Sequence, residues 1–140
     1  MIKEDYVSFE LAKMLKEKGF DEACITFYYV NDSNKRVILL FQEDETAVNY
    51  MENSTCNEAE ITAPTLQMAQ KWFREEKHLA INPTTYYRKL EGHEFHNWGC
   101  DIVNLDTWEL YCSNSLETFP ADTYEEVLEK AMKYALEKFV

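Results

Sequence analysis

With 140 residues, of which 46% are hydrophobic, the chain is long enough to bury a core of its own, and we expect one globular domain over residues 1–140. Its 26 acidic and 14 basic residues give a formal net charge of −12. This charge repels phosphate groups, so direct binding to DNA, to RNA or to an anionic membrane surface is disfavoured.

The N-terminal residues and the cysteines indicate the compartment. Residues 1–6 lack the basic region and apolar stretch of a signal peptide, and the longest aliphatic and aromatic run, residues 37–41, is far too short to span a bilayer. The four cysteines are widely spaced and include no C-x-x-C pair. We therefore expect a cytoplasmic protein with free thiols.

A capped helix and a hairpin are predicted at the start of the chain. Ser8 suits the N-cap of a helix, and Gly19 can end that helix in a left-handed conformation with Leu15 in its last turn. Residues 24–30 and 36–42 are rich in Ile, Phe, Tyr, Val and Leu, and turn-forming residues separate them. These two runs predict a β-hairpin.

An acidic stretch, residues 43–60, follows the hairpin. It contains six acids and no Lys or Arg, which favours a long connection. Because structureless segments of this length are uncommon in compact domains, we expect some strand or turn structure around residues 47–51.

The central helix is predicted over residues 63–77. Its apolar positions recur at helical spacing and include Trp72 and Phe73, so these aromatic side chains are expected in the core. Pro64 suits the first turn of this helix, and Thr62 suits its N-cap.

The second half of the chain predicts strands and a final helix. Residues 79–81 and 84–88 are strand-like, and Pro83 between them indicates an edge strand or a bulge. Residues 98–104 and 107–112 predict another hairpin. The sequence TYEE, which begins at Thr123, has the spacing of a capping box and starts a strongly amphipathic helix.

Together these elements predict an α+β fold. The expected order is α-β-β-α-β-β-β-α, with a mainly antiparallel sheet of about five strands. Three helices with one apolar stripe each would cover one face of that sheet, which gives a two-layer sandwich.

The predicted helices also carry a resemblance. The stretches VSFELAK with KGF, APTLQMAQKW, and TYEE with ALE resemble a family of small uncharacterised acidic proteins from gut Bacteroidales genomes and their phages or mobile elements. Residues 43–60 and 91–98 depart most from that family. The resemblance implies a bacterial or phage origin and a cytoplasmic protein, and it carries over no catalytic residue.

The best metal candidates are His93 and His96, with Cys100 four residues further on. Imidazole and thiolate are ligands for zinc and other transition metals. However, two residues between histidines is a short spacing, and Gly92 and Asn97 favour a solvated loop. We keep the three residues as metal candidates and expect no cofactor.

Carboxylates provide the other catalytic hypothesis. Asp101, Asp106 and Glu109, with Glu91 and Glu94, could supply a pair like that of glycosidases, but such pairs are frequent in an acidic chain. The sequence has no nucleophile elbow, H-E-x-x-H helix, P-loop or dinucleotide fingerprint. We assign no catalytic residue, and a small metal-dependent or acid–base hydrolase that uses the His93 and His96 region is an alternative.

Charge and aromatic residues favour protein interaction instead. Residues 90–129 contain ten acids and no Lys or Arg, and aromatic side chains are interleaved with them. A solvated surface explains most such charge, but an acidic face could also meet a basic partner or imitate DNA in the groove of a DNA-binding protein. The interaction candidates are Asp101, Asp106, Trp108, Glu109 and Tyr111.

We therefore expect a non-catalytic accessory or interaction protein of a bacterial or phage cytosol with an unidentified protein partner. Its oligomeric state is left open, a homodimer included. A DNA-mimic inhibitor and the hydrolase are the two alternatives.

Overall fold

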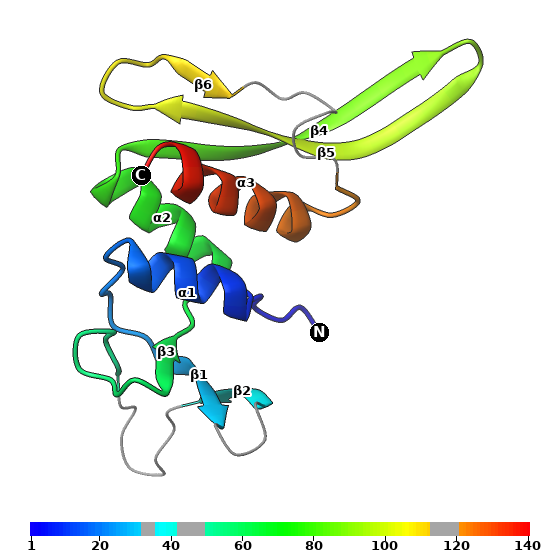
Figure 1. The fold of residues 1–140 in the computed structure, drawn as a ribbon. Helices are drawn as coiled ribbons and strands as arrows, with labels where there is room; N and C mark the ends of the chain where they lie inside the picture. The colour runs from blue at the N-terminus through cyan, green and yellow to red at the C-terminus, as the bar shows by residue number, and fades with distance from the viewer. Residues whose placement is uncertain (32–35, 42–49, 113–120) are drawn as a thin grey trace. The chain divides into compact units, whose positions relative to one another are not determined.

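The computed structural model describes residues 1–31, 36–41, 50–112 and 121–140, and within them it shows three helices and six strands (Figure 1). Contacts divide the chain into two compact units, Met1–Ala69 and Gln70–Val140. Each unit contains one three-stranded antiparallel sheet, with strand orders β2-β1-β3 and β4-β5-β6. The elements in chain order are α1 (Phe9–Glu17), β1 (Thr26–Asn31), β2 (Arg36–Phe41), β3 (Glu60–Thr62), α2 (Leu66–Glu76), β4 (Leu79–Leu90), β5 (His93–Asn104), β6 (Leu110–Cys112) and α3 (Tyr124–Lys138).

The α+β class and the three helices are confirmed, but the predicted sheet differs. Instead of one sheet of about five strands, the described residues form two sheets of three. The reason is that each predicted hairpin has its own third strand: β3 pairs with β1 of the first hairpin, and β4 pairs with β5 of the second. A single domain over residues 1–140 stays a prediction.

The first helix ends as the sequence predicts. The Ser8 hydroxyl accepts a hydrogen bond from the Leu11 N–H at 3.2 Å, which caps the N-terminus of α1. Gly19 has φ +94°, and the Phe20 N–H donates to the Leu15 carbonyl at 2.9 Å. The Gly19 N–H also donates to the Lys16 carbonyl, and the two hydrogen bonds together form a Schellman ending. Phe20 is buried in the core of this unit.

The first sheet is built on β1. Its partner β2 runs antiparallel with Val30 opposite Val37, as the predicted hairpin requires, although residues 32–35 of the turn lie outside the described residues. The acidic stretch contributes β3. Of the structure expected around residues 47–51, only residues 50 and 51 are described, and Met51 forms an isolated antiparallel bridge with Cys24.

The start of α2 corrects the predicted cap. Thr62 is a buried residue of β3, so the helix begins three residues later than Ala63. The Thr65 hydroxyl accepts a hydrogen bond from the Met68 N–H at 3.1 Å and takes the capping role instead. Pro64 therefore precedes the helix, and its carbonyl accepts from the Val7 N–H at 3.0 Å.

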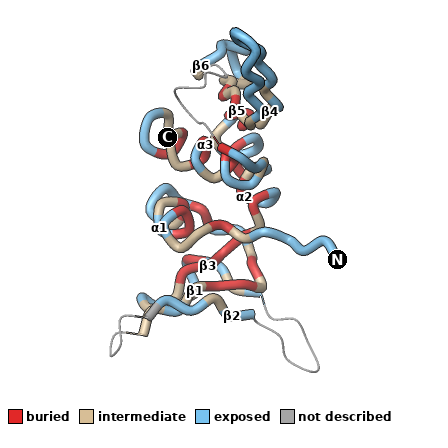
Figure 2. The backbone as a smooth tube through the Cα atoms, turned by 90° about the vertical axis from the view of Figure 1, so that its right-hand side faces the viewer, coloured by how far each residue is buried: buried red, intermediate tan, exposed pale blue. Residues whose placement is uncertain are grey.

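In the second unit, α3 packs on β4 and β5 (Figure 1). Thr123 caps it by accepting from the Glu126 N–H at 3.1 Å, as predicted. The Glu126 side chain, however, accepts from the Asp122 N–H rather than from the Thr123 N–H. The stripe of α3 is buried, as Figure 2 shows in red, and consists of Val127, Leu128, Ala131, Met132, Ala135 and Leu136.

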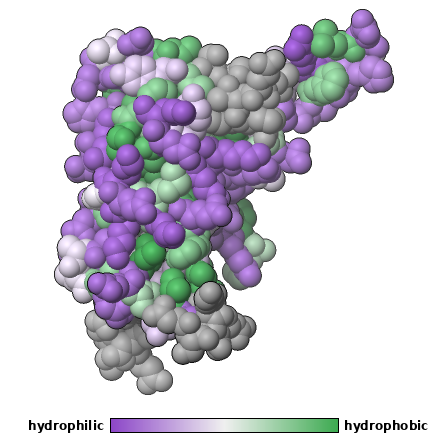
Figure 3. Space-filling model, viewed as in Figure 1, coloured by the Kyte–Doolittle hydropathy of each residue, from purple (hydrophilic) through white to green (hydrophobic). Residues whose placement is uncertain are grey.

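The β4–β5 hairpin is much longer than the sequence predicts. Residues 92–97, expected as a solvated loop, instead belong to the two-residue turn at Glu91 and Gly92 and to the start of β5. Both turn residues have positive φ (+50° and +83°), which is the type I′ geometry that matches the twist of paired strands. The hairpin extends beyond α3, and residues 87–96 are all exposed, with hydrophobic groups among hydrophilic ones (Figure 3).

Pro83 lies within β4 without breaking it. Because the two-residue turn makes Leu90 and His93 a hydrogen-bonded pair, alternation makes Pro83 and Cys100 a pair without ladder hydrogen bonds. The missing N–H of Pro83 therefore faces away from β5, on the outer edge of the sheet. The predicted edge strand is confirmed, and the strand runs through Pro83 in one piece.

Candidate functional site

The β5–β6 turn, residues 105–109, brings together three of the five predicted interaction residues: Asp106, Trp108 and Glu109. The Asn104 side chain organises the turn because its carbonyl oxygen accepts from the N–H groups of Asp106 (2.8 Å) and Thr107 (3.1 Å). The Trp108 N–H donates to the Asn104 backbone carbonyl at 2.7 Å. The turn is thus fixed by its own hydrogen bonds.

His78 ties this turn to the connection between α2 and β4. Its carbonyl accepts from the Leu105 N–H at 2.7 Å, and its Nδ1 lies 2.8 Å from Asp106 Oδ1. The backbone of His78 is left-handed, with φ +54°. The His78 ring therefore orients the acidic residue of the β5–β6 turn.

Trp108 is the most exposed large aromatic side chain in the described part of the chain, with 77% of its surface accessible. Its φ is +61°, a conformation that costs a bulky residue about 1–2 kcal/mol. An exposed indole on a strained but hydrogen-bonded turn contributes little to the core. Trp108 therefore stays a candidate for contact with another molecule.

The other two interaction candidates lie beside the turn. Asp101 is half-buried within β5. Tyr111 is in β6, where its hydroxyl accepts from the Asn104 amide and its ring packs on Phe139 with centroids 4.8 Å apart. Tyr111 therefore supports the turn, while Trp108 and Glu109 are presented to solvent.

The structure does not bring the three metal candidates together. His93 and His96 are three residues apart on β5, so their side chains point to opposite faces. Cys100 lies on the face of His96 but is four residues away and buried. Within the described ranges, no cluster of three His, Cys, Asp or Glu side chains could hold a metal ion. His96 instead contacts Glu94 at 3.5 Å and the Tyr87 ring.

The His78–Asp106 pair resembles part of a catalytic constellation, but its surroundings do not support catalysis. Both side chains are more than half exposed. Where the chain is described, Asp106 is the only hydrogen-bond partner of the His78 ring, so no Ser, Thr, Cys or Lys nucleophile is activated by it. The pair is suited to orienting charge at a surface.

Three of the four cysteines are poor nucleophiles as well. Burial raises the pKa of Cys24 to about 11 and that of Cys100 to about 12, and it also raises the pKa of Cys56. We predict that iodoacetamide at pH 8 modifies Cys24 and Cys100 at least about 100-fold more slowly than free cysteine, because roughly one in a thousand of these thiols or fewer is ionised. Peptide mass spectrometry measures this, with urea-unfolded protein as the reactive control. Modification of either residue at the free-cysteine rate in folded protein would contradict the assignment.

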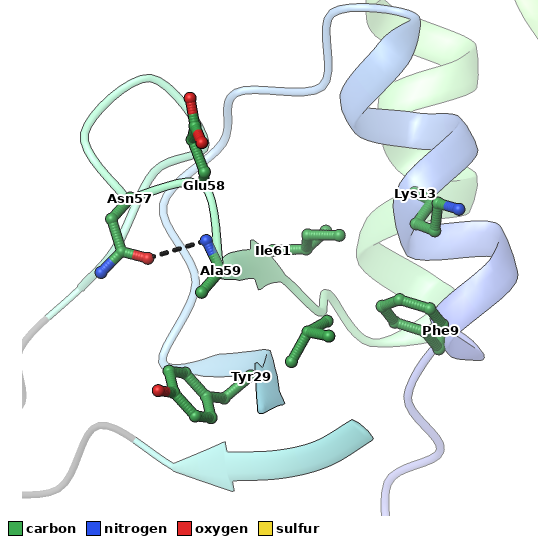
Figure 4. Close-up of a pocket in the computed structure, with 8 residues that line it drawn as sticks. Phe9, Lys13, Tyr29, Asn57, Glu58, Ala59 and Ile61 are labelled. Atoms are coloured by element: carbon green, nitrogen blue, oxygen red, sulfur yellow. Dashed lines mark hydrogen bonds between the residues drawn. The ribbon is translucent and has the colours of Figure 1, made fainter. Parts of the chain in front are cut away.

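A hollow in the first unit has a volume of about 770 Å³ (Figure 4). It lies between α1 and the strands β1 and β3, and Phe9, Tyr29 and Ile61 supply apolar walls. Its ionisable groups other than Tyr29 are Lys13 and Glu58, which are both exposed. This hollow contains no histidine or cysteine, and it carries no evident acid–base pair.

Comparison with known protein families, curated proteins and solved structures found no significant match. In the ranges that the structure covers, none of the helices has the length and apolar character needed to cross a membrane.

Sequence reasoning identified Trp108 but missed His78 and the long hairpin. The hairpin predicted from residues 98–104 and 107–112 has its turn at residues 105–109, and the Asn-Leu-Asp-Thr sequence at Asn104 is the signal of a side-chain-capped turn there. The pairing of His78 with Asp106 joins residues 28 positions apart, which local patterns do not report.

Proposed function

We propose that this protein is a non-catalytic interaction protein that binds a protein partner through the β5–β6 turn, with Trp108 as the anchor. The main support for this proposal is that Trp108 has an exposed indole and a backbone φ of +61° on a turn fixed by hydrogen bonds. Tryptophan is enriched among the residues that dominate binding energy at interfaces, and a fixed turn loses little conformational entropy on binding.

The charge around Trp108 defines the partner surface. Asp106 and Glu109 flank the indole, and the chain as a whole is strongly acidic. A matching partner surface has an apolar pocket for the indole and basic residues at its rim. An indole has no counterpart in a phosphate backbone, so the turn favours a protein-binding anchor over a DNA mimic.

The setting that we propose follows the family resemblance: the cytoplasm of a gut Bacteroidales bacterium, in which the gene belongs to the genome, a phage or a mobile element. Accessory proteins of this kind would act on a host protein. We propose neither a cofactor nor a membrane association.

Site-specific cross-linking tests the proposal. A photoreactive amino acid replaces Glu109, beside the anchor, and in a matched protein it replaces Glu137, an exposed acid of α3. After illumination in Bacteroidales cells, we expect one predominant cross-linked protein from position 109 and not from position 137. The absence of a cross-link, or the same products from both positions, would refute an interface at the turn.

A further inference from the structure

A second binding feature lies where the β4–β5 hairpin leaves the cover of α3. It is a hollow of about 240 Å³, smaller than the roughly 300–1,000 Å³ of typical small-molecule sites, so its size suits one side chain. The pairs Thr85–Trp98 and Tyr87–His96 face into it, and the pair between them, Tyr86 and Asn97, lines it. Since side chains alternate between faces, that middle pair contributes backbone to the floor.

The walls of the hollow are aromatic. Tyr87 and His96 have ring centroids 5.0 Å apart, and Tyr87 is 59% exposed. On the other side, Trp98 packs edge-to-face with Tyr124 of α3 at 5.4 Å, which fixes the indole. Aromatic faces carry negative potential and attract cations within about 6 Å of the ring centre.

The hollow also carries negative charge. Asp122 lines it just before the Thr123 cap of α3, and the Asp122 carboxylate makes no hydrogen bond or ion pair with another described residue. At the rim, Glu94 contacts both the Tyr87 hydroxyl (3.4 Å) and His96 (3.5 Å). No Lys or Arg is among the lining residues.

We propose that this hollow binds the guanidinium group of an arginine from a basic segment of the partner protein. The inference rests on the proposed function, because it names the chemistry of a partner segment. The planar guanidinium stacks on Tyr87 and Trp98 while donating to the Asp122 carboxylate. Arginine fits better than lysine because a flat, weakly hydrated cation uses both the rings and the carboxylate.

A tripeptide titration tests this directly. The probe is N-acetyl-Ala-Arg-Ala-amide, and its control contains citrulline, which has nearly the same shape without the charge. Titrations of the full chain at low salt are followed by proton–nitrogen NMR. We expect the arginine peptide to shift the signals of Tyr87, His96, Trp98 and Asp122, including the Trp98 indole N–H, and the citrulline peptide to shift them at least about fivefold less at equal concentration.

Point variants of the hollow test whether the arginine peptide binds there. Asp122→Asn is expected to weaken binding of the arginine peptide at least about fivefold, and Tyr87→Leu at least about threefold. Glu137→Gln removes the same charge from an exposed position elsewhere on α3 and is expected to leave the affinity unchanged. Equal binding of both peptides, or equal losses from Asp122→Asn and Glu137→Gln, would overturn the proposal.

The same titration separates this inference from the proposed function. Trp108→Gly is expected to remove the partner cross-link yet leave the peptide titration unchanged. If the cross-link at position 109 is found but the arginine peptide does not bind, the arginine site is wrong and the interaction function stands.

Discussion

Replacing Trp108 by glycine is expected to stabilise the protein while it removes partner binding. Trp108 adopts φ +61°, where glycine has no steric penalty, so the free energy of unfolding should rise by about 0.5–1 kcal/mol. Loss of an anchoring indole should weaken the partner complex at least about 30-fold, since anchor residues contribute about 2 kcal/mol or more. Urea unfolding followed by circular dichroism measures the change in stability. Titration calorimetry with the partner protein that the cross-link identifies measures the change in affinity.

Alanine at the same position separates the effect of the backbone conformation on stability from the effect of the indole on partner binding. Trp108→Ala removes the indole but keeps the β-carbon, so it should lose partner affinity to the same extent without the gain in stability. A glycine variant that is less stable than the natural protein would show that the indole supports the fold. A glycine variant whose partner affinity stays within threefold would show that the turn is not the interface.

The largest loss of stability is expected from Leu128→Ala. Leu128 is fully buried on α3, which packs on β4 and β5, and truncation leaves a cavity that its neighbours fill incompletely. Such substitutions cost about 2–5 kcal/mol. Urea curves of the full chain, followed by circular dichroism, give the difference in the free energy of unfolding.

Glu137→Ala provides the matched substitution on the same helix. Glu137 is exposed, so its replacement should change the free energy of unfolding by no more than about 0.5 kcal/mol. A loss below about 1 kcal/mol for Leu128→Ala would mean that α3 is not held on the sheet by this side chain.

Local signals predicted the helices well. The Ser8 cap, the Gly19 ending and the Thr123 cap each depend on residues within one or two turns, and all three are confirmed. The cap of α2 was misplaced because Thr62 and Thr65 are both capable of the role. Thr62 belongs to the sheet because β3 pairs with β1. This pairing joins residues far apart in the sequence, so local patterns do not predict it.

The second sheet and much of the candidate site depend on tertiary pairing. The Glu91–Gly92 turn was missed because Glu is an unusual residue at φ +50°, where Asn or Asp is the common signal. Residues 93–97 were therefore predicted as a loop, although they form the start of β5 and pair with β4. Trp108 and Glu109 were predicted from residue type alone, whereas the left-handed backbone of Trp108 is known only from the structure.

Pro83 also bears on how the protein behaves at high concentration. A twelve-residue strand at the margin of a sheet is a template on which further chains can stack into fibrils. By alternation, Pro83 presents no donor at this margin, and Lys89 lies on the same outward register, where its charge repels an identical strand. Both features disfavour the pairing of a further strand along this margin.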